Sequence, residues 1–212
     1  MKRISRFLNS FCILAVTCVL PLGAKANTDY ERLVVFGDSL SDPGNAYALF
    51  GMSLVPPYTD LVPEYPYARS GHHLSNGSTW IEQLATKIRQ ANSAGPALRK
   101  PGVFSNYAID RTRACPDGAS YIDLSRQVVE LFLGENGTAP ANALYVMFVG
   151  SNDVRDALVA RDPAIIECAL YSIYTNIMML VYAGATDFLI PNVPNLGMVP
   201  AVVLQGEEAK QA

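Results

Sequence analysis

The sequence predicts an α/β fold built on a parallel β-sheet. Short apolar runs alternate along the chain with segments of helical periodicity, and several of these runs stop at a glycine or a polar turn. Parallel strands that are buried on both faces read as nearly continuous apolar runs, and helices are the usual connections between them. We see no internal repeat and no second domain, so residues 27–212 are expected to form one domain. The predicted strands are 33–36, 103–109, 143–149 and 187–190.

The overall composition is that of a globular protein. Half of the 212 residues are hydrophobic, 17% are charged, and the net charge is −3. A chain of this length can bury a sizeable core. Nothing in the charge balance suggests a nucleic-acid partner, because such partners require clustered positive charge.

The N-terminus has the pattern of a secretory signal peptide. Lys2, Arg3 and Arg6 precede an apolar run over 11–22, and Ala24-Lys25-Ala26 is a small-residue cleavage site. We therefore expect cleavage after Ala26 and a secreted or periplasmic mature protein. A retained membrane anchor is the alternative, although the run is short for a membrane span.

Cleavage would leave two of the four cysteines, Cys115 and Cys168. In an oxidising compartment such a pair can form a disulfide bond, and two free thiols are equally compatible with the sequence. Two thiols far apart in sequence lack the spacing of a metal site. No metal is therefore expected.

Three helices are expected between and after the strands. Ser78 can cap the first, Gly134 can stop the second and Gly184 can cap the third. For the third helix, the expected core stripe includes Leu170 and Leu180. The proline-rich segment 51–77 reads as a surface loop over the sheet edge at which Ser39 lies. The predicted helices are 79–91, 123–133 and 163–183.

Reactive residue types follow the predicted strands. Ser39 comes two residues after Gly37, Asp110 follows the second strand, and Asn152 follows Gly150 at the end of the third. Ligands of open α/β sheets bind at the carboxyl ends of the strands. Each residue alone is explained equally well as an ordinary turn residue.

Taken together, these blocks resemble the GDSL, or SGNH, family of esterases and lipases. The resemblance extends over about 32–211 and implies a three-layer α/β/α, flavodoxin-like sheet. It also implies a serine esterase or lipase that hydrolyses carboxylic esters through an acyl-serine intermediate, with no cofactor. The segments that carry it are 37–40, 106–110 and 150–153, with an S-N-G-x-x-W stretch at 75–80 and Pro191-Asn192-Val193-Pro194.

The resemblance also implies roles for three residues. Ser39 would be the nucleophile, and its backbone N–H would be one donor of the oxyanion hole. The Asn152 side-chain amide would be a second donor, and the backbone N–H of Asp110 a third. The family has glycine where this chain has Asp110. A carboxylate is unfavourable beside an oxyanion, so we expect Arg111 or Arg113 to pair with it.

The general base is the larger departure from the family. Its members carry a D-x-x-H block near the C-terminus, after a fifth strand, and this sequence has none after its fourth predicted strand. We therefore expect a C-terminally incomplete portion of such a hydrolase that lacks the last strand. The alternative is that His72 or His73 is the base.

Two functional hypotheses follow. The first is a secreted GDSL esterase whose partner is a small-molecule or lipid ester, with transient contact at a membrane surface. The second is a non-catalytic remnant of that fold that binds an acyl or glycan ligand. The sequence specifies neither the substrate nor the oligomeric state.

Overall fold

The computed structural model describes residues 30–50, 73, 75, 77–116, 118, 122–199 and 203. The predicted signal peptide, residues 1–26, and most of the predicted loop 51–77 lie outside the described residues. The fold and the site below concern only the described ranges.

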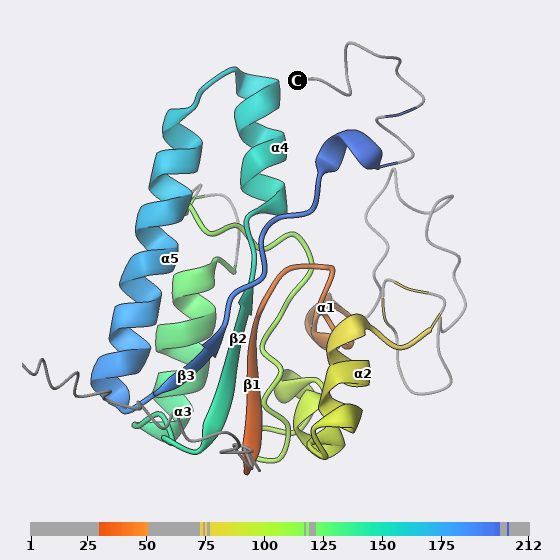
Figure 1. Ribbon diagram of the computed structural model, residues 1–212, viewed down its shortest axis with the longest axis vertical. Helices are drawn as coiled ribbons and strands as arrows, with labels where there is room; N and C mark the ends of the chain where they lie inside the picture. Colours follow the sequence, from red (N-terminus) through yellow and green to blue (C-terminus); the bar gives the residue numbers. More distant parts are fainter. Residues whose placement is uncertain are drawn as a thin grey trace, which may run out of the picture.

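A parallel sheet forms the centre of the molecule (Figure 1). Its strands are β1 (Arg32–Gly37), β2 (Ala143–Phe148) and β3 (Asp187–Leu189), in the order β1-β2-β3. Gly37 pairs with Phe148, so the carboxyl ends of β1 and β2 lie next to each other. The predicted α/β fold with a parallel sheet is confirmed.

The segment 103–109 is not the regular strand that the sequence predicts. It runs parallel to β1, where Val35 forms an isolated bridge with Asn106 and accepts the Tyr107 N–H at 2.7 Å. The Asn106 side chain accepts the Ala108 N–H at 2.9 Å. This local hydrogen bond lies on the side of the segment away from β1, while on the near side the Val35 N–H donates to the Ser105 carbonyl and the Ile109 N–H to the Gly37 carbonyl, as in a ladder. The segment nevertheless occupies the position of a strand on the free side of β1.

Helices cover both faces of the sheet (Figure 1). One face carries α2, and the other carries η4 and α5, which gives the three layers expected of the family fold. The helical elements are α1 (Asn45–Phe50), α2 (Trp80–Lys87), η2 (Ala91–Ala94), η3 (Ala97–Arg99), η4 (Arg126–Leu133), α3 (Gly134–Asn136), α4 (Ser151–Ala160), α5 (Ala164–Ala183) and η5 (Leu196–Met198).

Strand β1 is buried on both faces, because its successive side chains enter different hydrophobic clusters. Phe36 packs in one cluster, where its ring centroid lies 5.6 Å from that of Phe132. Leu33 and Val35 pack in the other, against Ile81 of α2. A continuous apolar strand such as β1 is therefore what this architecture requires.

The helix ends differ from the predicted ones in three places. The first predicted helix, 79–91, is shorter than expected, because α2 ends at Lys87 and a separate 3₁₀ helix, η2, begins at Ala91. The N-cap of α2 is Thr79 and not Ser78, because Glu82 accepts the Thr79 N–H at 2.6 Å in a capping box. The second predicted helix does not stop at Gly134. It continues through α3 to Gly137, whose φ of 68° ends it.

Helix α5 confirms the third predicted helix but not its whole buried stripe. Leu180 is fully buried, whereas Leu170 is 62% exposed. The buried positions are instead mostly small or polar, including Ala169 and Asn176. By length and composition α5 could cross a membrane, with a mean hydropathy of 1.6. Its Leu180 side packs into the cluster below the sheet, as in the core helix of a globular domain.

The structure contains a disulfide bond between Cys115 and Cys168, with a Cα–Cα distance of 5.2 Å. Of the two arrangements that the sequence allowed, the disulfide is confirmed. Cys168 lies in α5, and Cys115 lies in the irregular segment after Asp110. The bond therefore ties this segment covalently to α5.

Candidate active site

Ser39 lies in the turn that directly follows β1. Asp38 holds the turn, because its Oδ1 accepts the Leu40 N–H at 3.0 Å and its carbonyl accepts the Ser41 N–H at 3.0 Å. Among the described residues, neither the hydroxyl nor the backbone N–H of Ser39 has a hydrogen-bond partner. Ser39 is half-buried, so its two polar groups remain available at the strand end.

Glycines are required where β1 and β2 end. A Cβ atom on Gly37 would lie 2.4 Å from the Phe148 carbonyl oxygen, which no side chain tolerates. Gly150 has a φ of 121°, and a Cβ there would lie 3.1 Å from Val193. The close approach at Gly37 lets the turn that contains Ser39 pack directly on the end of β2.

Asp42 organises the backbone around the turn, and the sequence did not single it out. Its Oδ1 accepts the N–H groups of Gly44 at 2.7 Å and Asn45 at 2.6 Å. Its Oδ2 accepts those of Ala46 at 3.1 Å and Asp110 at 2.9 Å. Burial raises the pKa of Asp42 to about 6, although the four donors lower it. The available signal was the Asp-Pro-Gly-Asn turn, in which aspartate commonly accepts nearby N–H groups.

Asp110 lies beside the turn, but its N–H is already used. It donates to Asp42, so serving an oxyanion would require this N–H to be shared or released. The Asp110 carboxylate faces Arg111, with 3.7 Å between Oδ2 and Nε. Burial raises the pKa of Asp110, and Arg111 opposes this. Arg111 itself has a φ of 63°, a conformation that favours glycine.

Asn152 lies in the first turn of α4, just past the end of β2. Its Nδ2 donates to the Thr112 carbonyl at 2.9 Å. This bond uses one of the two amide hydrogens, and the other has no acceptor among the described residues. The amide is therefore oriented by the protein and keeps one donor available.

Several contacts hold the segment after Asp110 onto α4. Asp153 is buried and accepts the N–H groups of Ala114 at 3.0 Å and Cys115 at 2.8 Å. Arg113 forms an ion pair with Asp156. Of the two arginines expected to pair with Asp110, Arg111 does so, whereas Arg113 pairs with Asp156 of α4.

The S-N-G-x-x-W stretch contacts the turn that contains Ser39 through its tryptophan. The Trp80 indole N–H donates to Ser41 Oγ at 3.0 Å, and its ring meets Phe148 edge-on with centroids 5.5 Å apart. Asn106 Nδ2 donates to the Ser41 carbonyl at 2.9 Å. Ser41 is thus held from both α2 and the segment beside β1.

His73 is bound to α2. Its Nε2 lies 3.0 Å from Glu82 Oε2, and its buried Nδ1 has no hydrogen-bond partner among the described residues. Burial raises the pKa of Glu82, but hydrogen bonds from His73 and Thr79 outweigh this and leave it lowered. No hydrogen bond joins His73 to Ser39 among the described residues, so the structure does not support His73 as the base. His72 lies outside the described residues.

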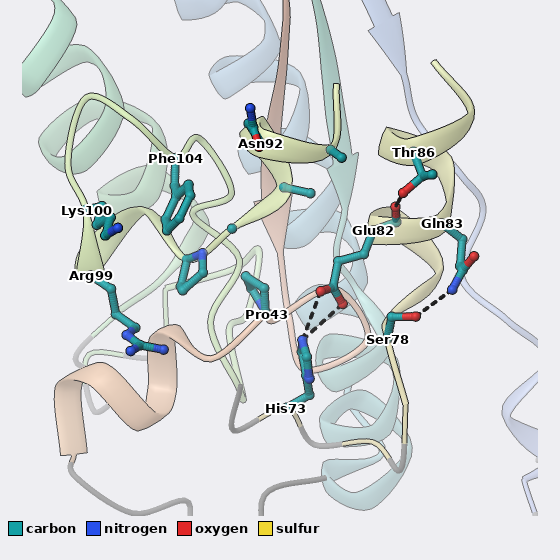
Figure 2. Close-up of a pocket in the computed structure, with 14 residues that line it drawn as sticks. Pro43, His73, Ser78, Glu82, Gln83, Thr86, Asn92, Arg99, Lys100 and Phe104 are labelled. Atoms are coloured by element: carbon teal, nitrogen blue, oxygen red, sulfur yellow. Dashed lines mark hydrogen bonds and ion pairs between the residues drawn. The ribbon is translucent and has the colours of Figure 1, made fainter. Parts of the chain in front are cut away.

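The His73–Glu82 pair borders a surface pocket of about 520 Å³ (Figure 2). Arg99 and Phe104 line the same pocket, and Pro43 connects it to the turn after β1. Within the described part of the chain, no group of three or more His, Cys, Asp or Glu side chains could hold a metal ion.

A serine at a strand end, beside an oriented amide on the neighbouring strand end, defines this chain as an α/β protein with the layout of a serine hydrolase. Residues 33–212 match the family of GDSL-like Lipase/Acylhydrolase proteins. The chain therefore belongs to this family, and the predicted membership is confirmed.

Three relatives indicate the range of the family. Lipase 1 of Photorhabdus luminescens is 28% identical over 92% of this chain and 27% of its own length. The phosphatidylcholine-sterol acyltransferase of Aeromonas hydrophila is 30% identical over 90% of this chain and 52% of its own. An acetylesterase of Thermothelomyces thermophilus is 26% identical over 85% of this chain and 59% of its own length. The chain thus spans less than two thirds of each relative.

Proposed function

We propose that this chain is a secreted serine esterase that hydrolyses carboxylic esters through an acyl-enzyme on Ser39. The observation that carries the proposal is the placement of Ser39 and Asn152 after paired strand ends. Gly37 pairs with Phe148, and the two candidate residues follow within a few positions on each chain segment. The names of the relatives, which include a lipase and an acetylesterase, support an ester substrate.

The chemistry follows from the groups that remain available. Ser39 Oγ attacks the ester carbonyl, a base accepts its proton, and the alcohol leaves to give an acyl-serine that water hydrolyses. The oxyanion would accept the Ser39 backbone N–H and the second Asn152 amide hydrogen. Both donors are positioned before the substrate binds, which is the arrangement that stabilises developing charge most effectively. Asp110 would contribute only by sharing its N–H with Asp42.

The base is proposed to be the histidine of a D-x-x-H block of the family kind, which residues 1–212 do not contain. His73 is a poor candidate because Glu82 engages its Nε2. The substrate class would be a small-molecule or lipid ester reached outside the cytoplasm, with transient contact at a membrane surface.

The test is covalent labelling with a fluorophosphonate, together with hydrolysis of p-nitrophenyl acetate, on an extended chain in which residues 27–212 are followed by a C-terminal segment that carries a D-x-x-H block. Residues 27–212 alone should turn over little ester, because they contain no such block. Ser39→Ala should abolish labelling, because the attacking oxygen is lost, whereas the exposed Ser78→Ala should not. Asn152→Ala should keep labelling and lower turnover by about 10²–10³-fold, the usual cost of one oxyanion donor. Labelling that persists in Ser39→Ala would refute the assignment.

The second candidate function is an acyl- or glycan-binding remnant without turnover. It is favoured by one observation, the engagement of His73 by Glu82, which leaves no described base near Ser39. The same experiment separates the two. A remnant would bind a fatty acid or glycan equally well before and after Ser39→Ala, and wild type would not be labelled.

A further inference from the structure

A single buried amide, that of Gln127, joins two of the segments that form the site. Gln127 is completely buried and lies in η4, which is a π-helix. Its Oε1 accepts the Gly37 N–H at 2.9 Å, and its Nε2 donates to the Gly37 carbonyl at 2.9 Å. The amide therefore forms two hydrogen bonds with the residue at which β1 ends, two positions before Ser39.

The same amide reaches the segment that orients Asn152. Nε2 of Gln127 also donates to the Thr112 hydroxyl at 2.7 Å. That hydroxyl in turn donates to the Ile109 carbonyl at 2.8 Å, so its direction is fixed. The Thr112 carbonyl accepts the Asn152 amide at 2.9 Å. An unbroken series of hydrogen bonds thus runs from Gly37 through Gln127 and Thr112 to Asn152.

We propose that Gln127 is a positioning residue that sets the placement of the Ser39 turn relative to the Asn152 amide. The proposal deepens the function proposed above and depends on it for its catalytic meaning. Gln127 touches no reacting atom, so it acts only through Gly37 and Thr112. No other described side chain hydrogen-bonds to both of these residues.

The amide group is the chemical type that this position needs. It supplies one acceptor and two donors, and all three are used here with good geometry. A carboxylate would keep the acceptor but place negative charge against the Gly37 carbonyl. An apolar side chain would leave the buried Gly37 groups unpaired, which is costly. π-Helical turns are frequent at functional sites, and here η4 carries the amide into the site.

The inference can be tested without turnover, by NMR on oxidised, ¹⁵N-labelled residues 27–212. The readouts are the Asn152 side-chain NH₂ signal, assigned by its loss in Asn152→Asp, and hydrogen exchange at the Gly37 N–H. Gln127→Met removes all three hydrogen bonds at similar volume. Val128→Ala is the matched control, because Val128 is the buried neighbour in the same turn and packs in the hydrophobic cluster.

Gln127→Met should shift the Asn152 NH₂ signal. It should also speed hydrogen exchange at the Gly37 N–H by about tenfold or more relative to Val128→Ala, compared at matched global stability. A lost hydrogen bond of about 1.4 kcal/mol corresponds to a tenfold change in the exchange rate. Should Gln127→Met not fold, Thr112→Val provides the test. It removes the hydroxyl and should shift the Asn152 signal, and Thr112→Ser should restore it. An Asn152 signal that is unmoved by these changes, or moved equally by Val128→Ala, would overturn the proposal.

Fluorophosphonate labelling of the extended chain, which carries the D-x-x-H block, separates this inference from the proposed function. In a labelled wild type, Gln127→Met should slow labelling more than Val128→Ala does. A wild type that is not labelled would refute the proposed function, while the NMR comparison would still decide whether Gln127 positions Asn152.

Discussion

Removing the Cys115–Cys168 disulfide should lower the free energy of unfolding by about 4 kcal/mol. The bond closes a loop with a sequence separation of 53 residues. In the chain-entropy relation, a loop of that length restricts the unfolded ensemble by about 14 cal/mol/K, which is about 4 kcal/mol at 25 °C. The loss would be a large part of the stability of an ordinary domain.

The assay is urea denaturation of residues 27–212, followed through the fluorescence of the single tryptophan, Trp80. Oxidised wild type is compared with the double variant Cys115→Ala/Cys168→Ala and with reduced wild type. The two forms without the bond should agree closely, and both should unfold at a lower urea concentration than the oxidised protein. A difference in unfolding free energy below about 1 kcal/mol would refute the reasoning from loop entropy.

The native site should change little in the same double variant. Asp153 still accepts the N–H groups of Ala114 and of residue 115, and Arg113 still pairs with Asp156. The segment around Thr112 would then keep its contact with Asn152. We therefore expect the disulfide to act on the unfolded state and not on the geometry of the site. Loss of the Asn152–Thr112 contact in the folded variant would contradict this.

Three further outcomes concern the carboxylates around the turn. Asp42→Asn keeps one acceptor oxygen, so two buried N–H groups lose their partner, and the free energy of unfolding measured with urea should fall by about 2–4 kcal/mol; an unchanged urea midpoint would contradict this. Burial raises the pKa of Asp38 to about 6 from 3.8, so the folded state binds the proton more tightly and stability should fall by about 3 kcal/mol as pH rises from about 4 to 6. Asp38→Asn should remove this share of the pH dependence and make the profile less steep, while Asp42, whose pKa burial also raises to about 6, maintains the rest; an unaltered slope would exclude Asp38 as a contributor. Asp110→Ala keeps the backbone N–H that Asp42 accepts, so its stability should stay within about 0.5 kcal/mol of wild type; a loss as large as that of Asp42→Asn would show that the carboxylate itself is structural.

The sequence was sufficient wherever a short stretch determines the structure. The strands at 33–36 and 143–149 are continuous apolar runs, and each became a strand of the sheet. The same patterns placed Ser39 and Asn152 at neighbouring strand ends. These two strands could be predicted because burial on both faces leaves a clear local signature. The segment 187–190 also became a strand, although it begins with Asp187 and is largely exposed.

The sequence was insufficient where distant residues decide the outcome. The segment 103–109 has a strand-like composition and donates the Tyr107 and Ile109 N–H groups to β1. On its other side the Ala108 N–H donates to the Asn106 side chain and not to a further strand. Leu170 has the spacing of a core residue, yet the face of α5 that packs inward carries Ala169 and Asn176. Gln127 reads as an ordinary polar helix residue, because its partner Gly37 lies 90 positions away in the sequence. Local periodicity cannot reveal such pairings.

The use of backbone N–H groups at the sheet edge narrows the choice of oxyanion donors. The N–H groups of Leu40, Ser41, Asp110, Ala114 and Cys115 all donate to carboxylate or carbonyl oxygens of the protein. Of the groups assigned to the oxyanion hole, the Ser39 N–H and one Asn152 amide hydrogen have no acceptor among the described residues. Ser39 and Asn152 are both half-buried, so these two donors are accessible to an incoming group. An arriving ester oxygen would satisfy both at once, so the carboxylates that consume the neighbouring donors also direct the oxyanion to Ser39 and Asn152.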